Sequence, residues 1–193
     1  MSSTDQALDR LFPWFALRVR NRAEELVGSA LQGKGYETFV PTYLECRRYA
    51  SCVKKVNTAL FPGYLFCRLD ANRRLPLLTT PGVHHIVSFS GIPYPVDEEE
   101  VAAIKRVVDS KLPATPWPYL TVGNRARIES GPFLGLEGIV TTFKGRERLV
   151  LSVNLLQRSV AVEIDRSWIR PMGVAGPGAL LIREGSARER LSL

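Results

Sequence analysis

Apolar positions in the first half of the chain switch between strand spacing and helix spacing. Residues 14–20 alternate apolar and polar side chains, which predicts a strand. In residues 23–31 the apolar side chains recur at i, i+3, i+4, i+7 and i+8, which is one face of an amphipathic helix. Asn21 and Glu24 have the spacing of a capping box, so we expect them to begin this helix. The predicted buried stripe consists of Ala23, Leu26, Val27, Ala30 and Leu31.

The same kind of pattern continues to residue 110. Residues 36–44 predict a strand that Pro41 interrupts, and residues 59–69 predict a further strand. Residues 45–58 are basic and polar, which fits either a hairpin arm or a mobile loop. The remaining expected elements are a short helix at 73–80, a strand at 83–90 and a helix capped by Asp97, with Val101, Ile104 and Val108 as its buried stripe. This order predicts an α+β domain in which helices flank an antiparallel sheet.

In the second half of the chain the pattern changes to a proline-rich stretch followed by short strands. Three prolines within residues 111–121 predict a semi-rigid linker between two domains. The short strands expected after it are 125–129, 137–143, 148–153, 159–164 and 167–169. Five short strands in about 50 residues fit a small SH3-like barrel. The expected divisions are a flexible N-terminus at 1–12, a first domain at 13–110, the linker at 111–121, the barrel at 122–171 and a tail at 172–193.

Composition places the chain among ordinary globular proteins. Of the 193 residues, 45% are hydrophobic and 23% are charged, and the apolar runs fall short of the roughly 18 residues that a membrane span needs. The three cysteines make no disulfide framework, so we expect a reducing, cytoplasmic setting without membrane attachment. A net charge of +7 hints at a polyanionic partner.

Catalytic and metal-binding patterns do not emerge from the sequence. His84 and His85 are neighbours, and neighbours on a strand face opposite ways. Cys46 and Cys52 lack the close spacing of structural zinc sites. We therefore expect a protein that is not an enzyme and that carries no metal and no cofactor.

The basic residues of the first half allow two interpretations. Arg18 and Arg20 share a strand face, and Arg22 follows at the start of the helix. Together with Arg73 and Arg74 they would form an electropositive surface if the sheet gathers these segments. Such a surface would contact phosphates independently of base sequence. An ordinary solvated surface fits the composition equally well.

The stretch Leu60 to Phe66 places aromatic side chains on both sides of a Pro-Gly pair. Pro62 fixes φ and Gly63 tolerates positive φ, so the pair predicts a bulge or a sharp turn. Such a turn can direct Phe61 and Tyr64 to one exposed surface. The alternative is that both aromatic side chains belong to the core.

Three stretches together resemble NusG-type transcription elongation factors. Leu60-Phe61-Pro62-Gly63-Tyr64-Leu65-Phe66 is similar to their Phe-Pro-Gly-Tyr signature. Trp14-Phe15-Ala16-Leu17 is similar to the opening of their N-terminal NGN domain. Residues 122–140, with Ser130-Gly131-Pro132-Phe133 and Gly138-Ile139-Val140, are similar to their KOW motif. The resemblance covers residues 13–171 in the order of the family, so it implies an NGN-like domain followed by a KOW barrel.

The resemblance also implies partners. Phe61, Tyr64 and, near the start of the third helix, Val101 would bind the clamp helices of the largest RNA polymerase subunit as aromatic and apolar anchors. In some members a basic face touches the non-template DNA strand, a role that would fall to Arg18, Arg20 and Arg22. The KOW barrel of family members contacts a ribosomal small-subunit protein or Rho through an aromatic followed by Gly-Arg. Here the corresponding turn is Leu155-Leu156-Gln157-Arg158, with Leu156 and Arg158 as the candidate contacts.

Three functional interpretations follow. The basic, cysteine-containing arm at 45–58 and the Leu60 to Phe66 stretch that directly follows it resemble specialised NusG paralogues, which act as antiterminators on particular operons. The second interpretation is a housekeeping factor that links polymerase to Rho or to the ribosome. The third is a ribosome-associated KOW protein that binds RNA. We expect a monomer in each case.

Overall fold

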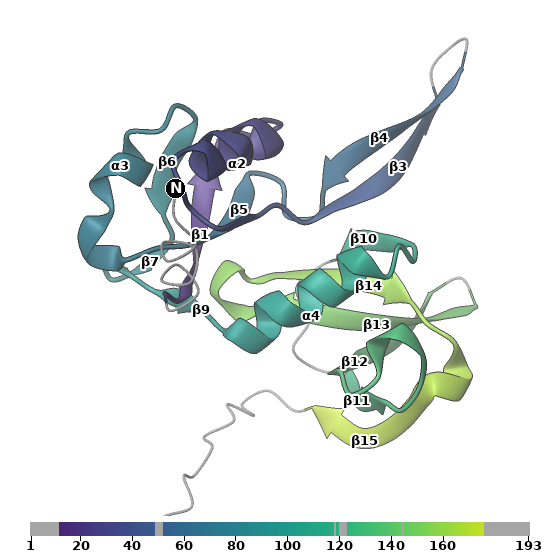
Figure 1. Cartoon of the computed structure of the whole chain (residues 1–193). Helices are drawn as coiled ribbons and strands as arrows, with labels where there is room; N and C mark the ends of the chain where they lie inside the picture. Colours follow the sequence, from purple (N-terminus) through teal and green to yellow (C-terminus); the bar gives the residue numbers. More distant parts are fainter. Residues whose placement is uncertain (1–11, 49–51, 118, 120–122, 144, 176–193) are drawn as a thin grey trace, which may run out of the picture.

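The computed structural model describes residues 12–48, 52–117, 119, 123–143 and 145–175, and it combines two main sheets with helices (Figure 1). Strand pairings among these residues are antiparallel throughout. The predicted mixture of helices and antiparallel sheets is therefore confirmed. The predicted flexible N-terminus, apart from Phe12, and the tail beyond residue 175 lie outside the described residues.

The first sheet has the strand order β2-β5-β1-β6. Its strands are β1 (Trp14–Val19), β2 (Thr38–Phe39), β5 (Tyr64–Arg68) and β6 (Val83–Ile86), and β9 (Pro95–Val96) pairs with the start of β1. Because side chains alternate along β1, Leu17 packs with α2 (Glu24–Gly33) and α3 (Leu75–Leu78), whereas Ala16 packs on the face that α4 (Glu98–Asp109) covers. The first sheet thus lies between two helical layers.

Helix α2 begins differently from the prediction. Its N-cap is Ala23, which makes no side-chain capping bond, and the expected capping box of Asn21 and Glu24 is wrong. Glu24 is instead buried and directs its carboxylate to another segment, described below. The buried face consists of Glu24, Val27, Gly28 and Leu31. Leu26, predicted to be buried, is 74% exposed, because the helix is rotated about its axis from the predicted stripe.

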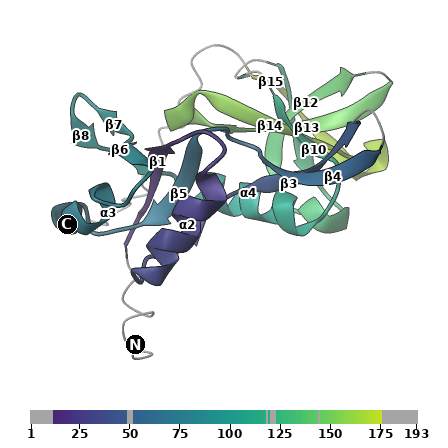
Figure 2. The same cartoon turned by 90° about the horizontal axis from the view of Figure 1, so that it is seen from above.

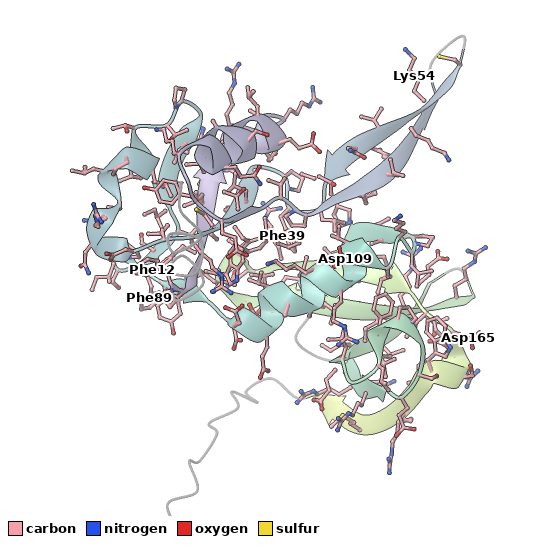
Figure 3. The ribbon with its side chains drawn as sticks, in the orientation of Figure 1. Phe12, Phe39, Lys54, Phe89, Asp109 and Asp165 are labelled. Atoms are coloured by element: carbon pink, nitrogen blue, oxygen red, sulfur yellow. The ribbon has the colours of Figure 1, made fainter. Side chains whose placement is uncertain are left out.

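A two-stranded arm projects from the first sheet. Strands β3 (Thr42–Arg48) and β4 (Val53–Ala59) pair in register from Thr42 with Ala59 to Arg48 with Val53. Figure 1 shows the arm leaving the body of the molecule, Figure 2 shows the same arm from above, and Figure 3 places Lys54 near its far end. Of the two structures that residues 45–58 allowed, the hairpin arm is the one found. A smaller hairpin, β7 (Ser88–Phe89) with β8 (Ile92–Pro93), follows β6.

The second sheet has six strands in the order β10-β14-β13-β12-β11-β15. They are β10 (Ala114–Trp117), β11 (Gly123–Ile128), β12 (Glu137–Phe143), β13 (Arg146–Val153), β14 (Arg158–Glu163) and β15 (Ile169–Ala175). Strand β10 lies inside the predicted linker, and Pro116 fits there because β10 is an edge strand, which needs no second row of N–H donors. Among the described residues, no pairing of β10 with β15 closes this path, so a closed five-stranded barrel is not formed by these pairings.

Helix α4 connects the two sheets. Asp97 caps it as predicted, because its Oδ1 accepts a hydrogen bond of 2.8 Å from the Glu99 N–H. The helix packs on β13 as well as on the first sheet, and a single apolar cluster runs through all three. In the described part of the chain, no helix has the length and apolar character needed to cross a bilayer.

Candidate functional site

Residues Phe61 to Tyr64 form a tight turn before β5. The Tyr64 N–H donates to the Phe61 carbonyl oxygen at 3.0 Å, and Gly63 has φ +79°. Proline at the second position and a glycine with positive φ at the third are the features of a type II turn. The Pro-Gly pair therefore makes a turn rather than a bulge, and strand β5 begins at Tyr64.

Phe61 points into the protein rather than out of it. Its side chain is 1% exposed and meets Phe66 edge-to-face, with the ring centres 5.8 Å apart. Val101, at 0% exposure, belongs to the same cluster. The expectation that the turn leaves both Phe61 and Tyr64 exposed is therefore wrong for Phe61, because the second sheet packs over it.

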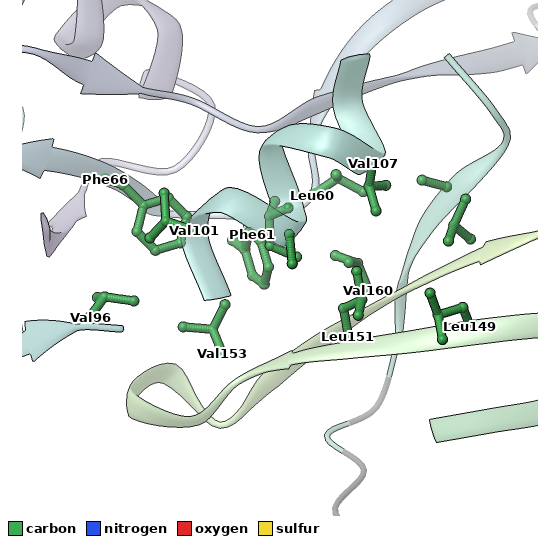
Figure 4. Packing of buried hydrophobic residues seen from close by; sticks show 14 of the residues in the cluster. Leu60, Phe61, Phe66, Val96, Val101, Val107, Leu149, Leu151, Val153 and Val160 are labelled. Atoms are coloured by element: carbon green, nitrogen blue, oxygen red, sulfur yellow. The ribbon is translucent and has the colours of Figure 1, made fainter. Parts of the chain in front are cut away.

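The second sheet supplies what we call the covering face, defined as Leu151, Val153, Arg158 and Val160 of β13 and β14. Figure 4 shows its apolar members facing Phe61 and the residues of α4. Leu151 is 5% exposed, and Val153 and Val160 are both at 0%. The predicted polymerase-binding residues Phe61 and Val101 are thus brought together beneath another part of the same chain.

Tyr64 lies at the edge of this contact, between two arginine side chains. The guanidinium carbon of Arg18 is 4.8 Å from the centre of the Tyr64 ring, and that of Arg158 is 5.3 Å from it. Arg158 is one of the predicted KOW partner contacts, and the other, Leu156, is half-buried against the same apolar cluster. The two predicted binding surfaces therefore face each other.

Hydrogen bonds reinforce the contact between α4 and the second sheet. Asn154 donates to the Glu100 carboxylate from its Nδ2 at 2.6 Å and from its backbone N–H at 3.3 Å, and its Oδ1 accepts from the Tyr119 hydroxyl. Burial raises the pKa of the Glu100 carboxyl, an effect larger than the opposing hydrogen bonds from Asn154. Farther along α4, the Arg106 guanidinium donates to the carbonyl oxygens of Pro132 and Leu134.

The five predicted nucleic-acid contacts do not share one environment. Arg18 is engaged within the protein, since its Nη1 donates to the carbonyl oxygens of Pro62 at 3.4 Å and Gly63 at 3.3 Å. Arg20 and Arg22 are exposed just beyond the end of β1. Arg73 and Arg74 are also exposed, but they lie on the connection from β5 to α3, which starts at the opposite end of β1.

The titratable side chains of the described residues do not gather into a metal site. In this part of the chain no three His, Cys, Asp or Glu residues lie close enough to hold an ion. Cys52 is exposed, and Cys67 is buried with its thiol directed to the Arg68 carbonyl oxygen at 3.5 Å.

Sequence reasoning missed three residues of this site, namely Glu24, Glu100 and Asn154. Glu24 and Glu100 both matched a local capping pattern, which hid their long-range partners. Glu24 bonds the Gly63 N–H, 39 residues away, and Glu100 bonds Asn154, 54 residues away. Asn154 carried no signal in the sequence, because an exposed asparagine next to a turn is common.

Comparisons with known proteins agree on one family. Residues 12–105 match the family model described as transcription termination factor nusG. The chain is 23% identical over 173 residues to the transcription termination/antitermination protein NusG of Helicobacter pylori, a match that covers 82% of this chain and 98% of the relative. It is 28% identical over 162 residues to the NusG protein of Thermus thermophilus, covering 77% and 88%.

A solved structure supports the fold. The structure described as domain interaction in Thermotoga maritima NusG aligns with a TM-score of 0.50 and 22% identity, over 85% of this chain and 99% of that one. At this level of identity the match speaks for the fold alone.

Proposed function

Because this chain is a NusG-like transcription factor, we propose that it is a termination/antitermination factor that binds the clamp helices of RNA polymerase. In this proposal Phe61, Tyr64 and Val101 are the anchors, and a clamp helix packs on the apolar surface that they form once it is uncovered. The chain acts by binding and not by catalysis, and it works as a monomer in the cytoplasm.

The observation that carries the proposal is the convergence of the three anchors. Phe61 and Val101 come from segments 40 positions apart, yet they share one apolar cluster, and Tyr64 packs against that cluster. Aromatic side chains are enriched among binding hot spots, and here a hydrogen-bonded turn holds two of them in place.

A clamp helix and the covering face compete for the same residues. Phe61 and Val101 cannot contact polymerase while Leu151, Val153 and Val160 lie over them. We therefore propose that the second sheet moves away from α4 when polymerase binds. The energy needed for that movement lowers the apparent affinity of the covered chain for polymerase.

The test compares Tyr64→Ala with Tyr94→Ala, a control tyrosine that is 54% exposed and lies outside the turn. Both changes are made in a chain that also carries Arg158→Ala, so that the loss of the Tyr64–Arg158 contact does not bias the comparison. Removing a central aromatic anchor typically costs about 2 kcal/mol or more of binding free energy. We expect at least about tenfold weaker binding of core RNA polymerase by Tyr64→Ala and unchanged binding by Tyr94→Ala.

A second experiment uses the parent chain with an affinity tag to isolate its partners from extracts of the cells that produce it. Recovery of polymerase subunits agrees with the proposal. Recovery of ribosomal subunits in their place would favour an RNA-binding KOW protein, and equal binding by the two tyrosine variants would contradict the anchor role.

We also propose that the chain is a specialised paralogue that promotes antitermination on particular operons. The projecting β3–β4 arm and the altered turn at 155–158 support this choice. A strain lacking the gene should lose distal transcripts of only a few operons. A genome-wide change in termination would support instead the housekeeping factor that links polymerase to Rho or to a ribosomal protein through Leu156 and Arg158.

Nucleic-acid contact is proposed for Arg20 and Arg22, which are exposed, whereas Arg18 is engaged by the turn. Replacing both with alanine should weaken binding of the non-template strand in a polymerase complex, and the difference should shrink at high salt. Arg73→Ala with Arg74→Ala serves as the comparison.

We also propose the two-domain division, with residues 111–121 as the linker and residues 122–171 as a KOW barrel.

A further inference from the structure

The turn at Phe61–Tyr64 leaves one backbone donor without a partner inside the turn. The closing bond uses the Tyr64 N–H and the Phe61 carbonyl, and the Gly63 carbonyl accepts from the Val19 N–H at 2.9 Å. The Gly63 N–H takes part in neither bond. Because Gly63 is buried, this N–H needs an acceptor from another segment.

Glu24 supplies that acceptor. Its Oε1 accepts a hydrogen bond of 2.6 Å from the Gly63 N–H, and the Glu24 residue is only 6% exposed. A buried carboxylate is costly unless it is hydrogen-bonded. Glu24 is the first residue of α2, where the positive end of the helix dipole further stabilises its charge.

Arg18 holds the opposite side of the turn. Its guanidinium donates to the carbonyls of Pro62 and Gly63 and lies against the Tyr64 ring. The turn therefore has a carboxylate on its N–H side and a guanidinium on its carbonyl side. Both groups come from β1 and α2, which belong to the first sheet and its helical layer and not to the covering face.

We propose that Glu24 is a positioning residue for polymerase binding, an inference that rests on the proposed function. Through the Gly63 N–H it fixes the orientation of the peptide between Phe61 and Tyr64, and so the relative placement of the two anchors. A fixed turn lowers the entropy lost when the anchors enter a partner's groove. Glu24 itself touches no partner.

The test uses the full chain and three variants. Glu24→Ala removes the acceptor, whereas Glu24→Gln keeps an acceptor oxygen without the charge. Glu25→Ala is the matched control, an exposed acid in the same first turn of α2. Two quantities are measured for each: the exchange rate of the Gly63 amide proton by nuclear magnetic resonance, and the affinity for core RNA polymerase.

We expect Glu24→Ala to exchange the Gly63 amide at least about tenfold faster and to bind polymerase about tenfold more weakly, because a charge-assisted hydrogen bond is lost. Glu24→Gln should stay within about threefold of the parent in both measurements, and Glu25→Ala should match the parent. If Glu24→Ala does not fold, Glu24→Gln decides, and a folded Glu24→Gln chain whose Gly63 amide is unprotected overturns the proposal.

Two further results would also overturn it: an unchanged Gly63 amide in Glu24→Ala, or unchanged polymerase affinity despite a deprotected amide. If the parent chain itself does not bind polymerase, the proposed function is wrong. The amide measurement still reports, in that case, whether Glu24 holds the turn.

Discussion

Gly63 is required at its position for two reasons, its backbone conformation and the closeness of neighbouring side chains. Its φ of +79° lies in the left-handed region, and an added Cβ would lie 2.2 Å from Arg18 Nη1 and 2.3 Å from Asn21 Oδ1. The turn requires the positive φ, and the side chains that hold the turn leave no space for a Cβ. A residue with a side chain would therefore strain the backbone and also displace Arg18 from the Tyr64 ring.

Gly63→Ala should destabilise the protein more than Gly91→Ala. Gly91 has a similar φ of +80°, but an added Cβ there meets nothing within 4 Å. We expect about 1–2 kcal/mol of unfolding free energy to be lost at Gly91 from backbone strain alone, and a larger loss at Gly63. Urea denaturation of both variants measures the difference, and equal losses would contradict the close approach of Arg18.

Local chemistry at this scale was predictable, but its long-range partners were not. The Pro62-Gly63 pair indicates a turn because proline presets the φ of the second turn position and glycine tolerates a positive φ at the third. Glu24 matched a capping box because that pattern uses the same residue type at the same spacing. Its real partner is set by how α2 packs near β5, which no local pattern contains. Arg18 was likewise predicted to contact nucleic acid, because no local pattern shows its hydrogen bonds to the carbonyl oxygens of Pro62 and Gly63.

Helix α4 is the element on which both sheets depend. On the first sheet, Lys105 Nζ lies 4.3 Å from the centre of the Trp14 ring and 3.5 Å from Glu37 Oε1. Toward the second sheet it presents Glu100 and Val101. The predicted stripe identified Val101 and Ile104, but Ala103 and Val107 are buried as well. A helix covered from two sides has a wider buried face than a single stripe predicts.

Glu100 should make the covered arrangement depend on pH. Burial raises the pKa of its carboxyl above the ordinary value of 4.5, so the covered form binds the proton more tightly. Its contribution to covering is thus fully present below pH 4.5 and is lost as the pH rises through the raised pKa. Glu163 does not add an opposing pH dependence to the covering. The hydrogen bond from Arg146 that lowers the pKa of Glu163 lies within the second sheet, so it is present whether or not that sheet covers α4.

Glu100→Gln removes the titrating group and keeps an acceptor for Asn154. Cross-peaks between the methyl groups of Val101 and Val153 report covering, because both side chains lie in the shared cluster. We expect these signals to weaken from pH 4.5 to pH 7 in the parent and to stay constant in Glu100→Gln. Glu129→Gln, an exposed change on the second sheet, should behave as the parent does. A parent signal that strengthens with rising pH would contradict this sign.

The whole molecule combines two sheets whose relative placement the sequence did not predict. Strands β11 to β14 were located to within about two residues, because their spacing and turns are local signals, whereas β10 was placed in the linker and the last strand, predicted at 167–169, is found at Ile169–Ala175. Leu151, Val153 and Val160 lie within the strands predicted at 148–153 and 159–164. Buried apolar residues look alike in sequence whether they pack within one sheet or across two, so the covering face was invisible until α4 and the second sheet were seen together (Figure 4).

The central claim is that the covering face competes with RNA polymerase for Phe61, Tyr64 and Val101. The most direct measurement is the affinity of the full chain for a clamp-helix fragment of polymerase, with and without Asn154→Ala plus Arg158→Ala. Asn154 lies in the short connection between β13 and β14 and Arg158 begins β14, and both are exposed, so their loss weakens the cover without altering the anchors. Arg170→Ala, an exposed arginine of the same sheet paired with Glu129, is the control.

A stacked guanidinium contributes about 0.5–1 kcal/mol and a hydrogen bond to a carboxylate about 1.5–3 kcal/mol. The double variant should therefore bind the fragment at least about tenfold more tightly than the parent and the Arg170→Ala control. Adding Tyr64→Ala should abolish that gain. Unchanged or weaker binding by the double variant would contradict the competition between the covering face and polymerase.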